Sequence, residues 1–180
     1  MKSVLISIQP KWVDKIASGE KTIEVRKTRP KLETPFKCYI YETTAKYKTR
    51  LLGLNCTCQG KGKVMGEFVC DKITDISVVV RNCNENYNEV YHNDECKGSC
   101  LTWKELQEYG KGKSLYGWHI RNLKIYDKPK DLSEFGNLCR KDCLRLGKGK
   151  SCEFLSTDGT PCNRIIPITR PPQSWCYVEV

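Results

Sequence analysis

The chain has 180 residues, 39% of them hydrophobic, which is enough for one buried core and a small appendage. Lysine and arginine number 31 against 21 aspartate and glutamate, and the net charge of +10 favours a polyanionic partner such as RNA or DNA, although it also serves simple solubility. Apolar runs are too short for a secretory leader or for a membrane span of about 20 residues. We therefore expect a cytoplasmic protein whose 12 cysteines stay reduced.

A charged cluster is predicted where the first helix meets the next strand. Residues 10–18 begin with proline and carry apolar side chains near helical spacing, which indicates a short amphipathic helix ended by Gly19. Residues 22–26 alternate and are β-branched, as in a strand. Side chains two apart on a strand share a face, so Glu24 and Arg26 lie side by side, and Lys21 can lean over them. The pattern fits a functional cluster at the mouth of a sheet or an exposed strand with a surface ion pair.

Further strands and one helix follow in chain order. Residues 37–41 are a predicted strand with Tyr39 and Tyr41 on one face and Cys38 and Ile40 on the other. Residues 64–72 are a further predicted strand, in which Gly66 permits a bend or bulge. Residues 75–80 indicate a short strand, and residues 81–98 a polar loop or insertion. Thr102 and Glu105 form a capping box that opens a helix to about Tyr109. Residues 116–125 are predicted to form one strand, after which residues 127–129 close the domain.

Three segments together resemble the ASCH domain, a relative of the PUA fold. Gly19, Lys21, Glu24 and Arg26 match its GxKxxExR signature, residues 5–10 are similar to its first strand and helix start, and residues 115–129 are similar to the last strand of phage-type members. The resemblance covers roughly the first two-thirds of the chain. It implies an α+β fold in which a small mixed PUA-like β-barrel with flanking helices, residues 1–129, carries a basic cleft. Residues 130–180 would form a Cys-rich appendage and a tail.

The appendage has little hydrophobic periodicity and is expected to need a staple. Four cysteines supply a candidate structural zinc site: Cys139, Cys143, Cys152 and Cys162. Thiolates are soft donors suited to tetrahedral zinc, whereas reduced cysteines that only pack are the alternative. A second candidate set lies in the polar insertion: Cys83, His92, Cys96 and Cys100.

The C-terminal residues 169–178 resemble the closing segment of phage and prophage ASCH proteins, and we expect them to fold back onto the barrel. Trp175 would then furnish one wall of the cleft or plug the core. His119 follows Trp118 on a strand, so the two face opposite sides. His119 would face the cleft or sit on the surface, and Tyr41 would stack on a base or pack in the barrel.

The function expected from these features is binding of RNA or another nucleotide-containing ligand in the basic cleft. The expected binding residues are Lys21, Glu24, Arg26, Lys27, Arg29, Lys61, Lys63, His119, Arg170, Gln173 and Trp175. A ribonuclease is the enzymatic alternative, with Lys21, Glu24, Tyr41 and His119 as its candidate catalytic residues. The resemblance also includes a nucleoside amidohydrolase branch with a threonine nucleophile, but Glu24 occupies that position here. An adaptor that grips a protein through the appendage is a third possibility.

Overall fold

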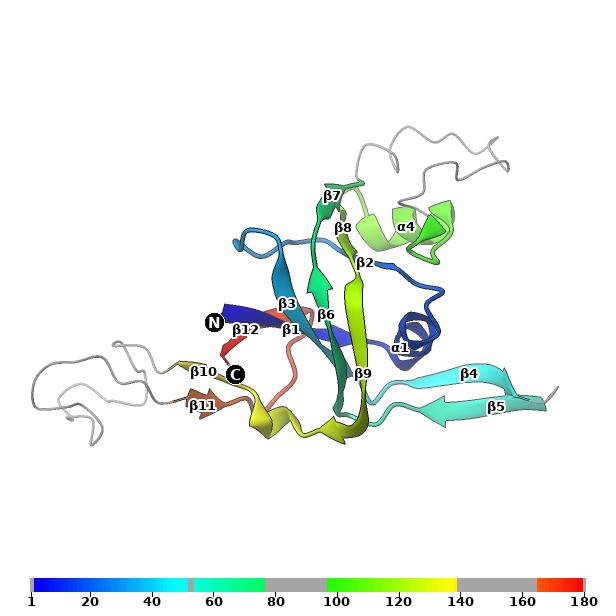
Figure 1. Ribbon diagram of the computed structural model, residues 1–180. Helices are drawn as coiled ribbons and strands as arrows, with labels where there is room; N and C mark the ends of the chain where they lie inside the picture. The colour runs from blue at the N-terminus through cyan, green and yellow to red at the C-terminus, as the bar shows by residue number, and fades with distance from the viewer. Residues whose placement is uncertain (1, 52–53, 77–96, 139–164, 180) are drawn as a thin grey trace, which may run out of the picture.

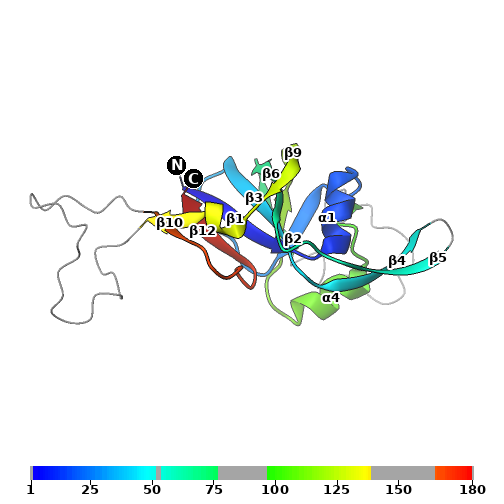
Figure 2. The ribbon, with the colours of Figure 1, turned by 90° about the horizontal axis from the view of Figure 1, so that it is seen from below.

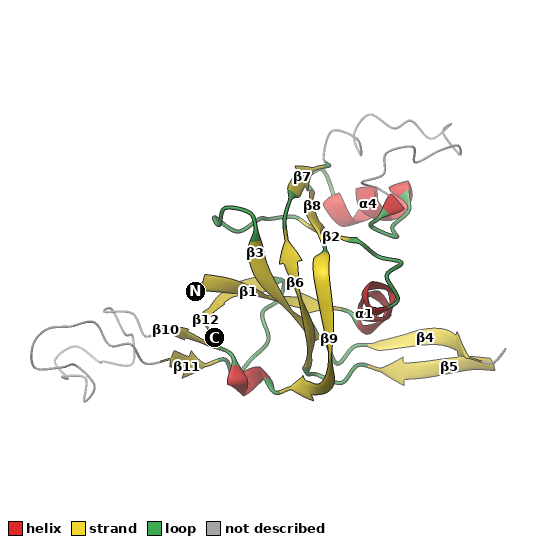
Figure 3. Ribbon diagram, in the orientation of Figure 1, coloured by secondary structure: helices red, strands yellow, loops and turns green. Residues whose placement is uncertain are grey.

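The computed structural model describes residues 2–51, 54–76, 97–138 and 165–179 (Figure 1). Its elements in chain order are β1 (Lys2–Ile8), α1 (Pro10–Ala17), β2 (Ile23–Arg26), β3 (Phe36–Glu42), β4 (Lys46–Leu51), β5 (Leu54–Gln59), β6 (Val64–Cys70), β7 (Ile73–Asp75), α4 (Trp103–Gly110), β8 (Tyr116–His119), β9 (Arg121–Lys130), the 3-10 helix η1 (Leu132–Glu134), β10 (Gly136–Leu138), β11 (Ile165–Pro167) and β12 (Trp175–Glu179). Strands make up half of this part of the chain, and α1 and α4 are its α-helices of known bounds (Figure 3). The predicted α+β class is confirmed. No described helix has the length and apolar character needed to cross a bilayer.

The largest sheet has seven strands in the order β11-β10-β12-β1-β3-β6-β9. β1 lies parallel to β3 and antiparallel to β12, with Leu5 opposite Tyr39 on one side and opposite Cys176 on the other. The segment before the C-terminus therefore lies beside the first strand, and both chain ends lie at the same side of the sheet (Figures 1 and 2).

The core lies on both faces of this sheet because its central strands are covered on each side. On β1, Val4, Ile6 and Ile8 pack in one hydrophobic cluster with α1, and Leu5 packs in a second cluster on the other face. β3 divides in the same way, with Ile40 in the first cluster and Tyr41 in the second. The alternation predicted for residues 37–41 is confirmed.

The strand predicted over residues 116–125 is wrong as one element. β8 ends at His119 and pairs with β2 and β7, whereas β9 begins at Arg121 and pairs with β6 in the large sheet. The amide of Ile120 donates to the carbonyl of Thr22, and Asn122 takes a left-handed φ of 47°. The chain bends at this point and passes from one sheet to the other.

This bend also bears on the predicted barrel. Among the described residues the strands form sheets of seven, three and two strands, and no closed barrel is present. Because β8 and β9 enter different sheets, the ladder of hydrogen bonds does not run round a closed circle. The predicted mixed core of strands with flanking helices is confirmed. The prediction that these strands close into a barrel is wrong for the described residues.

Local predictions elsewhere are mostly confirmed. Gly19, with a φ of 79°, follows α1. The β3–β6 ladder shifts register beside Gly66, where an added Cβ would lie 2.4 Å from the carbonyl oxygen of Lys124. Both hydrogen bonds of the Thr102 and Glu105 capping box are present. Of the strand predicted over 75–80, only Asp75 lies in β7, and residues 77–80 lie outside the described residues.

Candidate functional site

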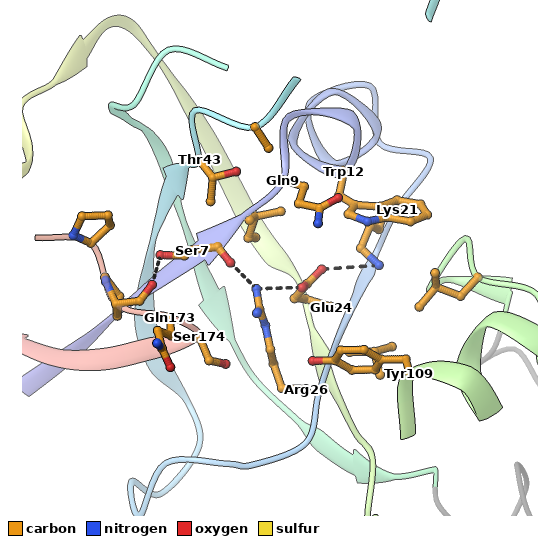
Figure 4. A pocket seen from close by; sticks show the side chains of 16 residues that line it. Ser7, Gln9, Trp12, Lys21, Glu24, Arg26, Thr43, Tyr109, Gln173 and Ser174 are labelled. Carbon is orange, nitrogen blue, oxygen red and sulfur yellow. Dashed lines mark hydrogen bonds and ion pairs between the residues drawn. The ribbon is translucent and has the colours of Figure 1, made fainter. Parts of the chain in front are cut away.

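A cavity of about 600 Å³ lies beside the end of β1. Its walls come from α1, β2, the segment between β3 and β4, α4 and the tail that precedes β12 (Figure 4). The side chains labelled in Figure 4 are Ser7, Gln9, Trp12, Lys21, Glu24, Arg26, Thr43, Tyr109, Gln173 and Ser174. Segments far apart in the sequence therefore meet at one site, and most of these side chains carry hydrogen-bonding groups.

The predicted charged cluster forms one wall of the cavity and is buried. Lys21, Glu24 and Arg26 are 2%, 6% and 8% exposed. One carboxylate oxygen of Glu24 lies 3.0 Å from Arg26 Nη2, and the other lies 3.4 Å from Lys21 Nζ. The alternative of an exposed strand with a surface ion pair is wrong, because all residues of β2 are buried. Glu24 and Arg26 share one face of the strand, as the alternation of residues 22–26 predicted, and they form an ion pair there.

Backbone carbonyl groups complete the network around the two cations. Arg26 Nη2 donates to the carbonyl oxygen of Ser7 at 2.6 Å, and Lys21 Nζ donates to that of Ser99, also at 2.6 Å. A buried charge is stable only when it is paired and hydrogen-bonded, and each of these charges meets that requirement. Two cations and one carboxylate leave the wall with a formal charge of +1.

The segment 97–101, which precedes α4, holds Lys21 in place. The carbonyl of Gly98 accepts from the amides of Thr22 and Ile23, both at 2.8 Å. A Cβ at Gly98 would lie 2.5 Å from Thr22 Oγ1, so a larger residue would have to displace the Thr22 side chain. The approach positions the neighbouring carbonyl of Ser99 over the lysine ammonium group.

Two polar atoms on residues that line the wall lack a hydrogen-bond partner within the protein. Arg26 Nε and Thr43 Oγ1 are buried and have no hydrogen-bond partner among the described residues. A buried polar group without a partner costs about 1–3 kcal/mol, so a bound acceptor at this place would stabilise the protein. The arrangement suits a ligand with carbonyl or phosphate oxygens.

Two aromatic side chains that the sequence reasoning did not assign to the site complete the cavity. Tyr109 at the end of α4 is 37% exposed, points its hydroxyl group toward the charged network and has Lys27 Nζ 4.7 Å from its ring centroid (Figure 4). Burial raises the pKa of the Tyr109 phenol, although the Arg26 guanidinium opposes the shift. Trp12 on α1 has Lys21 Nζ 5.2 Å from its ring centroid. The sequence placed Trp12 in an amphipathic helix and Tyr109 at the end of another helix, and only the tertiary structure reveals the cavity between the helices.

The C-terminal segment contributes only part of what was predicted. Gln173 lines the cavity, whereas Arg170 is exposed and does not line it. Trp175 packs at 5.8 Å from the ring of Trp118, and its Nε1 donates to Thr28 Oγ1 at 2.9 Å. Trp175 is half-buried and packs against the first core cluster, which agrees with the alternative to a cleft wall.

The other predicted binding or catalytic residues lie outside the cavity. His119 Nε2 is 2.9 Å from Thr74 Oγ1, and Tyr41 is buried in the second core cluster. Lys63 forms an ion pair with Asp131. Tyr41 lies on the far face of the sheet because alternate residues of β3 face opposite sides.

Two further predicted cations are exposed at other places on the surface. Lys61 donates through its backbone amide to the Glu42 carboxylate at 2.5 Å, and its side chain is exposed. The Arg29 guanidinium lies 5.6 Å from the centroid of the Tyr116 ring. Neither residue lines the cavity.

The predicted zinc ligands lie outside the described residues: Cys139, Cys143, Cys152 and Cys162. In the second candidate set, Cys83, His92 and Cys96 also lie outside them, whereas the Cys100 thiol donates to the carbonyl of Glu20 at 3.3 Å. The described ranges contain no group of three or more His, Cys, Asp or Glu side chains arranged to hold a metal ion. Zinc therefore stays a prediction.

Solved structures with a similar fold are ASCH proteins of Zymomonas mobilis. One ASCH structure from that organism has a TM-score of 0.54 and 17% identity, and the alignment covers 98% of this chain and 87% of that one. A point mutant of the same protein has a TM-score of 0.54 and 18% identity, with 99% and 91% covered. No curated protein matches the chain. The sequence model of the ASCH domain matches residues 6–130, so the chain belongs to the ASCH domain family.

Proposed function

We propose that this ASCH protein binds single-stranded RNA, or a ligand that contains a nucleotide, with one nucleotide in the cavity. The observation that carries the proposal is the buried Lys21, Glu24 and Arg26 network in the wall of a cavity of about 600 Å³. Pockets that bind small organic ligands have volumes of about 300–1,000 Å³, a range that includes a nucleotide. Membership of a family that is generally RNA-binding supports the same partner class.

The groups in the wall suit the parts of a nucleotide. Arg26 Nε and the Thr43 hydroxyl group are donors for a phosphate or carbonyl oxygen, and the Gln173 amide can donate to and accept from a base edge. Tyr109 offers an exposed aromatic ring on which an unstacked base can lie. The positive wall and the ring together favour a single-stranded nucleotide over a small apolar ligand.

The positions of the other candidate catalytic residues favour binding over catalysis. A ribonuclease that used Lys21 and Glu24 with Tyr41 or His119 would need these side chains near one phosphate. Lys21 and Glu24 line the cavity, but Tyr41 lies in the second core cluster and the His119 ring is hydrogen-bonded to the Thr74 hydroxyl group. Glu24, at the position of the threonine nucleophile in the amidohydrolase branch, is bonded to both cations.

Fluorescence anisotropy with a labelled single-stranded RNA across a salt series tests the proposal. Lys21→Met keeps the length of the side chain and removes its charge. Loss of a charged hydrogen bond costs about 1.5–3 kcal/mol, so we expect affinity to fall about tenfold or more. Lys37→Met removes an ion-paired lysine outside the cavity and is the matched control. We expect little change in its affinity.

The slope of the salt plot separates two modes of contact. A lysine that neutralises a phosphate on single-stranded RNA contributes about 0.7 to the slope, whereas a lysine that contacts a base edge leaves the slope nearly unchanged. Equal losses in Lys21→Met and Lys37→Met, with both proteins folded, would refute a cavity site. Lack of RNA binding even at low salt would refute the RNA part of the proposal, and titration with mononucleotides would then test the remainder.

A further inference from the structure

The hairpin of β4 and β5 projects from the body of the protein (Figures 1 and 2). The two strands form a sheet of their own, paired antiparallel from Lys46 opposite Gln59 to Leu51 opposite Leu54. Strands of this length extend roughly 20 Å at about 3.4 Å per residue. An isolated two-stranded hairpin is at best marginally stable in water. Because β4 and β5 pair only with each other, membership of the core sheets does not explain their length. We call residues 46–59 the arm.

The base of the arm is fixed beside the cavity. Tyr47 Oη donates to Asp14 Oδ2 on α1 at 2.6 Å. A Cβ on Gly60, the residue after β5, would lie 1.9 Å from the carbonyl oxygen of Thr43, so the two ends of the arm are packed together there. Thr43 and Ala45, which precede β4, both line the cavity. A chain that leaves the cavity on this side therefore meets the arm.

The arm contains cations and no acidic residue of its own. Its strands contain Lys46, Lys48 and Arg50 at alternate positions of β4, and no aspartate or glutamate. Lys46 and Lys48 are exposed, and in the part of the chain that the structure describes neither forms an ion pair. Exposed lysines at a spacing of two residues form a positive stripe that fits a polyanion.

The two faces of the arm differ in a way that indicates contact with phosphates rather than bases. Lys46 and Lys48 share their face with Gln59 and Thr57, which lie directly opposite and are also exposed. The aromatic Tyr47 lies on the other, half-buried face. The exposed face thus offers charge and small polar groups but no ring for base stacking.

We propose that the arm binds the sugar-phosphate backbone of the RNA strand that flanks the nucleotide in the cavity. This inference rests on the proposed function. A nucleotide inside the cavity is unstacked, so the flanking strand is single-stranded near the site. Three cations along one strand would each neutralise a phosphate. The protein would then contact several nucleotides of the RNA in addition to the single nucleotide in the cavity.

The test uses the full chain with all three arm cations changed to glutamine, Lys46→Gln, Lys48→Gln and Arg50→Gln. Anisotropy with a labelled single-stranded 15-mer measures binding to the cavity and arm together. At about 0.7 per phosphate, we expect the salt slope to fall by about 2. Competition by an unlabelled trinucleotide, which is too short to follow the whole arm, measures the cavity. We expect its inhibition constant to change less than threefold.

A second triple variant controls for the loss of overall charge. Arg121→Gln, Lys124→Gln and Lys128→Gln change three exposed cations of β9, none of which lines the cavity. We expect this variant to keep the salt slope of the wild-type protein to within about 0.7, the effect of one phosphate. Circular dichroism confirms that each variant is folded.

Several results would overturn the inference while leaving the proposed function intact. They are an unchanged slope in the arm variant, an equal fall in the β9 control, or an equal loss of trinucleotide and 15-mer binding. A loss seen only with double-stranded RNA or DNA would assign the arm to a duplex instead. If the wild-type protein binds neither the trinucleotide nor the 15-mer, the proposed function fails, and the inference fails with it.

Discussion

At the scale of single residues, Glu24 is the group on which the buried charges depend. It pairs with Lys21 and Arg26, and all three side chains are at least nine-tenths buried. Two buried cations close to one carboxylate repel each other, and the carboxylate offsets that repulsion. The same pairing orients both cations in the cavity wall. The stability of the fold and the shape of the candidate site therefore depend on one side chain.

Replacement of Glu24 by glutamine should destabilise the protein strongly. Removing one partner from a buried ion pair costs about 3–5 kcal/mol, because the remaining charges stay buried without compensation. Chemical denaturation measures this difference in the free energy of unfolding. Glu20→Gln is the matched control, since Glu20 pairs with Lys15 while its side chain is 57% exposed. Its cost should be below about 1 kcal/mol. Similar costs for the two variants would contradict the importance assigned to the buried network.

At the scale of elements, α4 connects a local sequence signal to the cavity. Thr102 Oγ1 accepts from the Glu105 amide at 3.2 Å, and the Glu105 carboxylate accepts from the Thr102 amide at 2.8 Å. Leu106 is fully buried and packs with Val25 of β2 and Leu115. The capped N-terminus and this contact fix the helix, and its last turn places Tyr109 in the cavity wall.

Loss of the cap should weaken α4 by a measurable amount. Thr102→Ala removes the acceptor for the Glu105 amide and should lower the free energy of unfolding by about 1 kcal/mol. Thr57→Ala, at an exposed position of β5, is the control and should change it by a few tenths of a kcal/mol, about ±0.5 at most. Thermal unfolding followed by circular dichroism measures both. A cost at Thr102 no larger than the control would show that the capping box contributes nothing to stability.

The same cap predicts a dependence on pH. Hydrogen bonds from the Thr102 backbone and side chain hold the pKa of Glu105 below its ordinary value of 4.5. A carboxyl group whose pKa is lower in the folded state adds stability above its unfolded pKa, and this stability is lost as the pH falls through the folded pKa. In Glu105→Gln the decline in stability below about pH 4.5 should be shallower than in the wild-type protein. An identical acid limb in both proteins would contradict this contribution.

At the scale of the whole molecule, the ASCH domain family model and the sheet do not have the same limits. The family match ends at residue 130, yet β12 pairs with β1 near the centre of the seven-stranded sheet. The C-terminal tail, which was expected to fold back onto the domain, therefore forms a strand of the main sheet. The four predicted zinc ligands belong to the range 139–164, between β10 and β11, which pair with each other. A metal site there would cross-link the segment that connects these two strands.

Native mass spectrometry of protein purified without chelator tests the metal prediction. We expect one zinc ion per chain and its loss in Cys143→Ser, because three remaining thiolates bind tetrahedral zinc more weakly than four. Cys56→Ser, which changes a cysteine of β5, should keep the zinc ion. The main sheet should stay folded in both variants, since its core lies in other elements. A chain that carries no zinc, or that keeps it in Cys143→Ser, would refute the proposed ligands.

The sequence predicted the features that depend on neighbouring residues. The end of α1 at Gly19, the capping box of α4, the two faces of β3 and the bulge beside Gly66 are local consequences of steric limits and of side-chain alternation. The proximity of Glu24 to Arg26 is local in the same sense, because the two residues share one face of a short strand. The family resemblance also depended on a short motif with fixed spacing.

Tertiary structure alone decided which of these features meet. The burial of Lys21 depends on the carbonyl of Ser99, and the place of Trp175 depends on Trp118, each partner lying far away in the sequence. The bend at Ile120 sends β8 and β9 into different sheets although their residues alternate like one strand. Local patterns fix the conformation of a segment and the side chains that share a face. The packing of distant segments decides which face is buried and where a cavity remains, because burial depends on contacts that no short stretch of sequence contains.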